Sequence, residues 1–413
     1  MSITRRIFLR NGALAVVGTS AMPSFLARAA SGASEATNAK RLVVIFQRGA
    51  ADGLNIVIPH AEASYYAMRP SINIPRSSVL DLDGFFGLHP AMAPLQPLWK
   101  QRHLAIVHAA GSPDPTRSHF DAQDFMESGT PGLKLTPDGW LNRALHSCPS
   151  PAKNSPFRAV ALNPSLPRIL AGRESATAVS NISQFAVAGA SPKASPISNT
   201  FESMYEQSVD TVLHGTGQET FEAVKMLKAA NPSKYMPAAG ADYPRGRFGE
   251  SLKQLAQLIK ANLGVQVAFA DIAGWDHHVN EGNAQGQLAI VLREFSQSLN
   301  AFWIDLGSLA EDTLVITMSE FGRTARENGN RGTDHGHANA MFILGGRVKG
   351  GKVYGRWPGL DPAQLYQGRD LALTTDFRQV LSEAVYRHLG NHNLSSVFPG
   401  FDGDPAKLLQ FLA

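Results

Sequence analysis

The stretch RLVVIFQRGAADGLN, residues 41–55, decides the fold class. It begins with an almost continuous apolar run, Arg41 to Phe46, and Gly49 and Gly53 follow. A continuous apolar run without alternation is typical of a strand that is covered on both faces. The glycines allow a tight turn after the strand. We therefore predict a buried strand whose carboxyl end leads into a loop that carries Asp52.

Further apolar runs of the same kind recur along the chain and alternate with segments of helical period. The predicted strands are residues 104–108, 159–162, 264–270, 313–317 and 340–344. The predicted helices are residues 251–260 and 288–306. Strands that alternate with helices indicate an α/β fold, an α/β/α sandwich with a mainly parallel central sheet.

Residues 1–29 predict a twin-arginine export signal. Arg5 and Arg6 precede an apolar stretch over residues 12–26, and the small-x-small sequence of residues 27–29 fits a cleavage site. The alternative is a short membrane anchor, but the stretch is short and broken by glycine and proline. We expect the twin-arginine translocase to export the chain, and the mature protein to be periplasmic or secreted without a stable membrane anchor.

Charge and cysteine content exclude several classes of protein. Without the four arginines of the signal, 34 Lys and Arg face 34 Asp and Glu, so nothing favours a nucleic-acid partner. Cys148 is the only cysteine, so no intrachain disulfide forms and the core must supply the stability. We expect one domain over residues 30–413, with a lid or insertion at about 172–244.

Polar clusters follow the predicted strands or open the next helix, which is where active sites of α/β sheets assemble. Asp52 follows the first strand and is a candidate metal ligand, with a helix N-cap as the alternative. Ser118 is a candidate nucleophile, activated by a metal or a helix N-terminus. It also fits a capping box with Asp121. His119 is a candidate acid or base.

The segment GWDHH, residues 274–278, carries a candidate metal pair. Asp276 and His278 are separated by one residue, so both can reach one cation, whereas His277 points away if the segment is extended. Imidazole with carboxylate suits zinc, manganese or iron better than calcium. The alternative is a solvated polar loop.

The last two clusters lie between residues 319 and 337. Glu320 at a buried strand end needs a cationic partner, either Arg323 or a metal. Arg323 is alternatively a clamp for a phosphate or sulfate oxygen. In RGTDHGHANA, residues 331–340, two histidines two positions apart project to the same side if the segment is extended, and an aspartate precedes them. The candidate metal ligands here are Asp334 and either His335 or His337.

Five motifs of this chain resemble the exported family known as domain of unknown function 1501, which is related in turn to the alkaline-phosphatase and sulfatase superfamily. They are LVVIFQRGAADGLN, SHFDAQDFMESG, GWLNR, GWDHH and MSEFGRTARENGNRGTDHGHA. The resemblance extends from Arg41 to the C-terminus. It implies an α/β/α sandwich with one or two divalent metals and a Ser, Thr or modified Cys nucleophile. The positions that match its site are Asp52, Ser118, Asp276, His278, Glu320 and either His335 or His337.

The chain departs from the superfamily pattern at three places. Phe321 stands where the second motif has histidine, so one ligand of a two-metal site is missing, unless His119 or Asp334 replaces it. The spacing from Asp276 to His278 is shorter than in the usual metal pair. The sequence after Cys148 lacks the Cys-x-Pro-x-Arg of sulfatases, which argues against a formylglycine enzyme.

These features together predict a metal-dependent hydrolase of phosphate or sulfate esters. Ser118 or a water is the expected nucleophile, Arg323 the clamp, and His119 or Asp334 the acid or base. The ester substrate, small molecule or polymer, is expected to be selected by the insertion. The rival is a non-catalytic metal-binding or assembly protein on the same fold. A metal oxidoreductase is the third hypothesis, but the chain lacks a cysteine cluster.

Overall fold

The computed structural model describes residues 40–148, 155–182 and 234–413, three further positions (223, 226 and 227), and the backbone of residues 8–10 and 13–15. Within the predicted export signal, only the backbones of β1 (Phe8–Arg10) and β2 (Ala13–Ala15) are described, as an antiparallel pair. The rest of the signal and most of the predicted insertion lie outside the described residues. No helix in the described part of the chain is long and apolar enough to cross a membrane.

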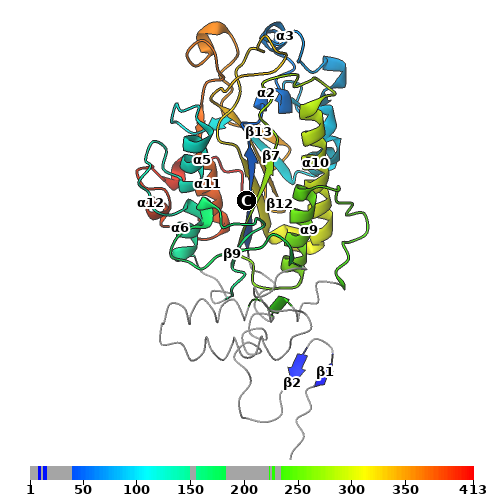
Figure 1. The fold of residues 1–413 in the computed structure, drawn as a ribbon, viewed down its shortest axis with the longest axis vertical. Coiled ribbons are helices and arrows are strands. Elements are labelled where there is room, and N and C mark those ends of the chain that lie inside the picture. Colours follow the sequence, from blue (N-terminus) through cyan, green and yellow to red (C-terminus); the bar gives the residue numbers. More distant parts are fainter. Residues whose placement is uncertain are drawn as a thin grey trace, which may run out of the picture.

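A nine-stranded sheet forms the centre of the molecule (Figure 1). Its order is β13-β7-β12-β11-β3-β10-β8-β9, and β14 pairs with β7. All its pairs are parallel except those that β12 makes with β11 and β7, so the prediction of a mainly parallel sheet is confirmed. The strands are β3 (Arg41–Arg48), β7 (Leu104–Gly111), β8 (Ala159–Ala161), β9 (Thr177–Ala178), β10 (Val267–Ala273), β11 (Thr313–Met318), β12 (Asn339–Gly345), β13 (Lys352–Tyr354) and β14 (Thr375–Asp376).

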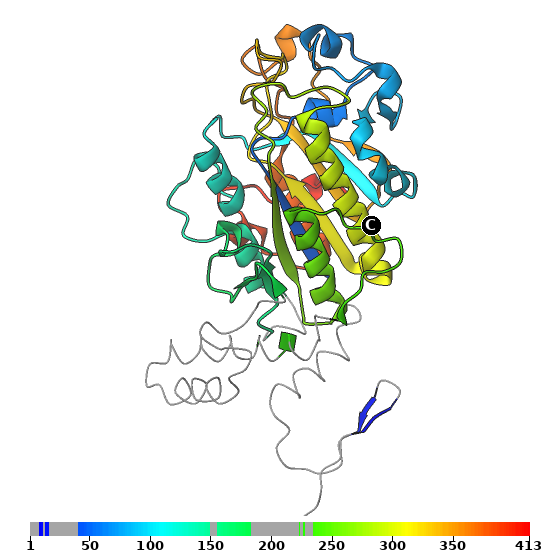
Figure 2. The ribbon, with the colours of Figure 1, turned by 45° about the vertical axis from the view of Figure 1, so that its right-hand side comes forward.

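Helices cover both faces of this sheet. In Figures 1 and 2, α5, α6, α11 and α12 lie on one side and α9 and α10 on the other. The α-helices are α2 (Gly53–Ile56), α3 (Ala63–Met68), α4 (Gln96–Lys100), α5 (His119–Ser128), α6 (Trp140–His146), α9 (Arg247–Lys260), α10 (Gln287–Leu306), α11 (Phe377–Glu383) and α12 (Leu394–Val397).

Shorter elements complete the chain. The 3-10 helices are η2 (Arg76–Ser78), η3 (Pro90–Leu95), η4 (Arg168–Leu170), η7 (Gly307–Asp312), η8 (Pro362–Gln364) and η10 (Pro405–Lys407), and η9 (Ala384–His388) is a π-helix. A small antiparallel sheet is formed by β4 (Val57–Ile58), β5 (Leu80–Asp81) and β6 (Gly87–Leu88).

The two layers of helices explain why the strands are apolar at consecutive positions. In β3, Leu42, Val44 and Phe46 pack into the core on the side of α6 and α11. Val43 and Ile45 pack into the opposite core, with α9 and α10. All five side chains are fully buried. Because successive side chains of a strand point to opposite faces, both sets of positions must be apolar.

The direction of β12 decides which loops meet at one edge of the sheet. Its neighbours β11 and β7 end where β12 begins, since both pairings are antiparallel. The segment before β12 therefore lies at the same edge as the loops that follow β3, β7, β10 and β11. This places RGTDHGHA beside the other polar clusters, although it precedes its strand.

Candidate metal centre

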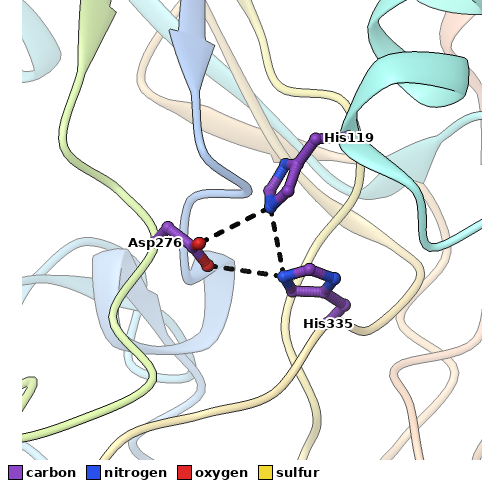
Figure 3. Close-up of side chains that lie close together, drawn as sticks. All are labelled: His119, Asp276 and His335. Carbon is purple, nitrogen blue, oxygen red and sulfur yellow. Dashed lines mark hydrogen bonds and ion pairs between the residues drawn. The ribbon is translucent and has the colours of Figure 1, made fainter.

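Three side chains from distant parts of the chain meet at this edge (Figure 3). His119 is the first residue of α5, and the Ser118 hydroxyl caps that helix by accepting from the Asp121 N–H at 3.5 Å. Asp276 lies in the loop after β10, and His335 lies in the segment before β12. One ligand atom from each of the three lies within 4.8 Å of the other two. We call these residues the ligand cluster.

The closest contact in the ligand cluster joins two imidazole nitrogens, and the carboxylate oxygens of Asp276 lie slightly further away. The Nε2 atoms of His119 and His335 are 3.1 Å apart. Asp276 places Oδ2 at 3.6 Å from His119 Nε2 and Oδ1 at 3.4 Å from His335 Nε2. All three groups thus direct a potential ligand atom toward a common point.

The outer nitrogen of each ring is already occupied. His119 Nδ1 donates to Glu320 Oε1 at 2.8 Å, and His335 Nδ1 donates to the carbonyl oxygen of Arg117 at 2.9 Å. A carbonyl oxygen only accepts, so the Nδ1 of His335 must carry a proton. In the neutral rings Nε2 then has only a lone pair, and the two lone pairs face each other across 3.1 Å. Such an arrangement is repulsive unless a metal ion or a proton on one of the rings lies between them.

The donor set and its spacing fit a divalent metal. Ligands at about 2.0–2.1 Å from a tetrahedral zinc lie about 3.3 Å apart, close to the separations in the ligand cluster. Metal-bound histidines characteristically donate their other N–H to a carboxylate or a backbone carbonyl, and both rings do so. Two imidazoles with one carboxylate suit zinc or manganese.

His278 and Asp334 lie beside the ligand cluster but outside its three-atom set. His278 Nε2 is 3.0 Å from both His335 Nε2 and Asp276 Oδ1. Its Nδ1 is 3.1 Å from Asp334 Oδ1, which also accepts from Asn328. Asp334 therefore orients a third imidazole toward the same point. Its pKa is lowered, since hydrogen bonds from Asn328 and His278 outweigh its partial burial.

Arg323, the expected oxyanion clamp, is completely buried behind the ligand cluster. Its Nη2 is paired with Asp276 Oδ1, its Nε donates to Ala50 O at 2.7 Å, and its Nη1 donates to Thr333 O at 3.2 Å. Burial opposes ionisation of Asp276, but the guanidinium outweighs it and lowers the pKa of that carboxyl. The arginine thus keeps Asp276 ionised while its own donors are turned toward the protein.

Glu320 contacts the ligand cluster through His119 but is not one of its three residues. Besides His119, its Oε1 accepts from Gln123 Nε2 at 2.8 Å and from the Gly49 N–H at 2.9 Å. These bonds outweigh burial and lower the pKa of Glu320. Of the two partners expected for Glu320, Arg323 pairs with Asp276 instead, and the protein groups that contact Glu320 are neutral donors and an imidazole. In return, the hydrogen bond to Glu320 raises the pKa of His119.

Asp52 lies in a separate buried group. It caps α2 through Leu54 N, as the alternative interpretation expected, and both of its oxygens accept from Arg69, at 2.5 and 3.0 Å. Glu281 is buried beside it and accepts from Asn55 at 3.2 Å and from Thr333 at 3.1 Å. Neither carboxyl belongs to the ligand cluster. We call Asp52 and Glu281 the buried acid pair.

The remaining candidates are placed as follows. His337 stacks on Tyr366 with ring centroids 4.4 Å apart, and it is not among the cluster residues. His277 is buried and likewise outside the cluster, and burial lowers its pKa to about 4. Phe321, in the place of the expected histidine, packs its ring 5.0 Å from the rings of both His119 and His335. It forms an apolar wall against both imidazoles.

Sequence reasoning missed Gln123, Asn328 and the carbonyl of Arg117, which hold the cluster in place. Gln123 had one recoverable signal, since it follows His119 by four residues and so shares its helix face. No sequence signal identifies the carbonyl oxygen of Arg117 as the acceptor for His335, because the two residues are 218 positions apart.

Several solved structures are similar to this chain. The C-terminal periplasmic domain of EcEptC from Escherichia coli, in complex with Zn, shares 9% identity over 75% of this chain and 74% of that chain, with a TM-score of 0.35. The PsFucS1 sulfatase from Pseudoalteromonas sp. shares 14% identity over 81% and 68%, with a TM-score of 0.36. The lipoteichoic acid synthase LtaP from Listeria monocytogenes shares 10% identity over 75% and 66%, with a TM-score of 0.32.

The sequence itself matches no curated protein. Residues 99–396 match the family described as protein of unknown function (DUF1501). This match spans α5 and both the Asp276 and His335 segments, and thus the whole ligand cluster. The chain belongs to the DUF1501 family.

Proposed function

We propose that this protein is an exported metal-dependent hydrolase of phosphate or sulfate esters on an alkaline-phosphatase-like α/β/α sandwich. One observation carries the proposal. His119 and His335 donate their Nδ1 protons outward, so that their Nε2 lone pairs and the Asp276 carboxylate share a space that suits a cation. Zinc or manganese fits this donor set.

A single metal ion is the form that we propose. Phe321 stands where a further histidine would complete a second site, and its ring packs against both cluster imidazoles. Glu320 is saturated by donors from His119, Gln123 and Gly49. Both residues therefore support the residues of the first site and leave no ligand for a second metal at their positions. A bound divalent cation supplies a Lewis acid that shields charge developing on an ester oxygen.

The chain's own residues supply the remaining functions. The Ser118 hydroxyl lies at the N-terminus of α5, directly before His119, where the helix dipole favours negative charge. Ser118 is the proposed nucleophile, and water is the alternative. His278, backed by the Asp334 carboxylate, orients Nε2 toward the cluster and can hold a proton there. Arg323 acts through Asp276, because its guanidinium is buried and paired with that carboxylate.

The proposed location is the periplasm or the extracellular space. The twin-arginine pattern of residues 1–29 supports export of a folded chain through the translocase. A protein that acquires its metal before export suits this route. The proposed substrate is a small-molecule or polymer ester, and no nucleic-acid partner is proposed.

The test combines metal analysis with hydrolysis of an ester panel. Protein purified without chelator is expected to contain about one divalent ion per chain, and chelation is expected to abolish turnover until zinc or manganese is restored. Ser118→Ala is expected to abolish turnover while sparing metal content, whereas the exposed Ser395→Ala serves as the control. Protein that neither contains nor takes up metal would refute the proposal. Full turnover by Ser118→Ala would transfer the nucleophile's role to water.

The second candidate is a non-catalytic metal-binding or assembly protein. Phe321 in place of the histidine and the complete burial of Arg323 favour it, because both leave fewer groups to face a substrate. It predicts tight metal binding with no turnover of any phosphate or sulfate ester. The same panel therefore separates the two candidates.

A further inference from the structure

Helix α5 presents a polar stripe that continues away from the ligand cluster. His119, Gln123 and Glu127 are spaced four residues apart and so lie on one face of the helix. His119 and Gln123 both donate to the same atom, Glu320 Oε1, at 2.8 Å each. Gln123 is not part of the ligand cluster, so the role of its bond to Glu320 must be different from metal binding.

Arg48 fixes the orientation of the Gln123 amide. Its guanidinium donates to Asp271 at 2.8 Å, to Glu127 at 2.8 Å and, through Nη1, to Gln123 Oε1 at 2.9 Å. An arginine has no acceptor, so the amide oxygen of Gln123 must face Arg48. The NH₂ group is then turned toward Glu320. The two carboxylates that flank Arg48 hold it in this position.

Glu320 transmits this orientation to His119. Its Oε1 accepts from Gln123, from the Gly49 N–H and from His119 Nδ1, and its Oε2 is 3.0 Å from the Ser319 hydroxyl. With these donors around it, the carboxylate can accept from His119 but has no proton to give. His119 must therefore protonate Nδ1, which leaves Nε2 free to bind a metal.

We infer that Gln123 is a positioning residue of the metal centre, which holds Glu320 so that His119 presents Nε2 as a lone pair. The inference rests on the proposed metal binding. Without the Gln123 donor, Glu320 loses one of the bonds that fix its carboxylate. His119 then populates the tautomer with a proton on Nε2, and that tautomer cannot ligate.

Two variants separate hydrogen bonding from packing. Gln123→Met keeps the length of the side chain but donates nothing to Glu320. Gln123→Glu keeps the shape and strengthens the pairing with Arg48, but it turns an oxygen toward Glu320. The matched control is Gln254→Met on α9, because Gln254 is a helical glutamine far from the ligand cluster whose side chain accepts from Ile182 N at 2.7 Å.

The measurements are the zinc dissociation constant and the tautomer of His119. We expect both Gln123 variants to weaken zinc binding by about 10-fold, the lower end of the effect of removing a direct partner of a metal-bound histidine, because Gln123 acts through Glu320. Gln254→Met is expected to bind zinc as the wild type does. Nitrogen-15 NMR of metal-free protein is expected to show His119 protonated at Nδ1 in the wild type and partly at Nε2 in both variants.

Unchanged zinc affinity together with an unchanged His119 tautomer in either folded Gln123 variant would overturn the inference. If Gln123→Met fails to fold, Gln123→Glu decides, since it retains the pairing with Arg48. The tautomer is measured without metal or substrate. A wild-type protein that binds no zinc would therefore refute the proposed function and still leave the role of Gln123 open to this measurement.

Discussion

The ligand cluster and the buried acid pair lie in loops at one edge of the same sheet, yet their charges are arranged in opposite ways. In the acid pair, the two oxygens of Asp52 accept from Arg69, and those of Glu281 accept from Asn55 and Thr333. In the ligand cluster, the Nε2 atoms of His119 and His335 face each other at 3.1 Å, and neither has a backbone or carboxylate partner of the kind that holds its Nδ1. The acid pair is bonded to donors of the protein itself, whereas the ligand cluster is where we propose that a cation binds.

The contrast gives a way to distinguish structural from functional polar groups. In both groups a buried arginine pairs with an aspartate, Arg69 with Asp52 and Arg323 with Asp276, so a carboxylate with a buried counter-ion does not by itself mark a metal site. What separates them is hydrogen-bond satisfaction, because buried polar groups that serve stability are paired.

The largest effect is expected from removal of Arg69. Arg69→Met leaves the Asp52 carboxylate buried without its counter-ion, and we expect a loss of about 3–5 kcal/mol in the free energy of unfolding. Urea denaturation measures it. Arg378→Met is the matched control, since Arg378 also pairs bidentately with an aspartate, Asp376, but nearer the surface. Its expected loss is below about 1 kcal/mol. Equal losses would show that the acid pair has no special role in stability.

The next largest effect concerns the two histidines of RGTDHGHA. His335→Ala is expected to weaken zinc binding by more than about 100-fold, or about 2.7 kcal/mol, because it removes a ligand rather than a ligand's partner. His337→Ala, two residues further on, is expected to leave zinc binding unchanged, since that ring stacks on Tyr366. Isothermal titration with zinc compares them. The reverse order of effects would contradict the assignment of the cluster.

A third prediction concerns pH. Protons and metal compete for His119 Nε2, and the hydrogen bond to Glu320 raises the pKa of His119 above 6.5. Zinc affinity is therefore expected to be constant above that raised pKa and to fall by about tenfold per pH unit below it. Titration at several pH values measures the slope. An affinity that is flat through the neutral and mildly acidic range would exclude His119 as a ligand.

The smallest effect is expected at Glu281. Burial and the neighbouring Asp52 raise its pKa well above 4.5, so the folded state holds a proton that the unfolded chain releases. The stabilising contribution is complete below pH 4.5 and is lost as the pH rises through the folded pKa. Glu281→Gln mimics the protonated acid, and its stability relative to wild type is expected to increase with pH. A constant difference at all pH values would show that Glu281 is ionised in the fold.

The fold was predictable because its signal is local. The apolar run at residues 41–46 lies within β3, and the run at 313–317 lies within β11. The reversal of β12 was not predictable, because a buried antiparallel strand has the same apolar pattern as a parallel one. Its consequence for the site nevertheless matches the expectation, since the RGTDHGHA segment lies at the shared edge.

The sequence predicted that His119, Asp276 and the RGTDHGHA segment lie at one edge of the sheet, but it did not predict how their side chains are bonded. The choice between His335 and His337 stayed open because extended backbone would turn both to the same side. In the structure, Gly336 N donates to Gly322 O and His335 forms a bridge with Arg323, so the segment is held against a neighbouring loop. The partners of Asp52 and Glu320 could not be predicted either, because Arg69, His119 and Gly49 approach these carboxylates only in the folded chain.

The reversal of β12 also bears on how this site tolerates change. The connection from β11 to β12 leaves the sheet at Met318 and returns to the same edge at Asn339. Glu320 and Arg323 lie near the start of this connection, and His335 lies near its end. A backbone bridge between Arg323 and His335 joins the two ends. The exposed tip at residues 329–331 lies beyond that bridge. The carbonyl oxygens of Asn330 and Arg331 accept from the N–H groups of Asn280 and Glu281, so the tip is tied to the loop that carries Asp276 and His278. Insertions or deletions at the tip are therefore expected to disturb that loop, while the bridge between Arg323 and His335 keeps the base of the connection in register.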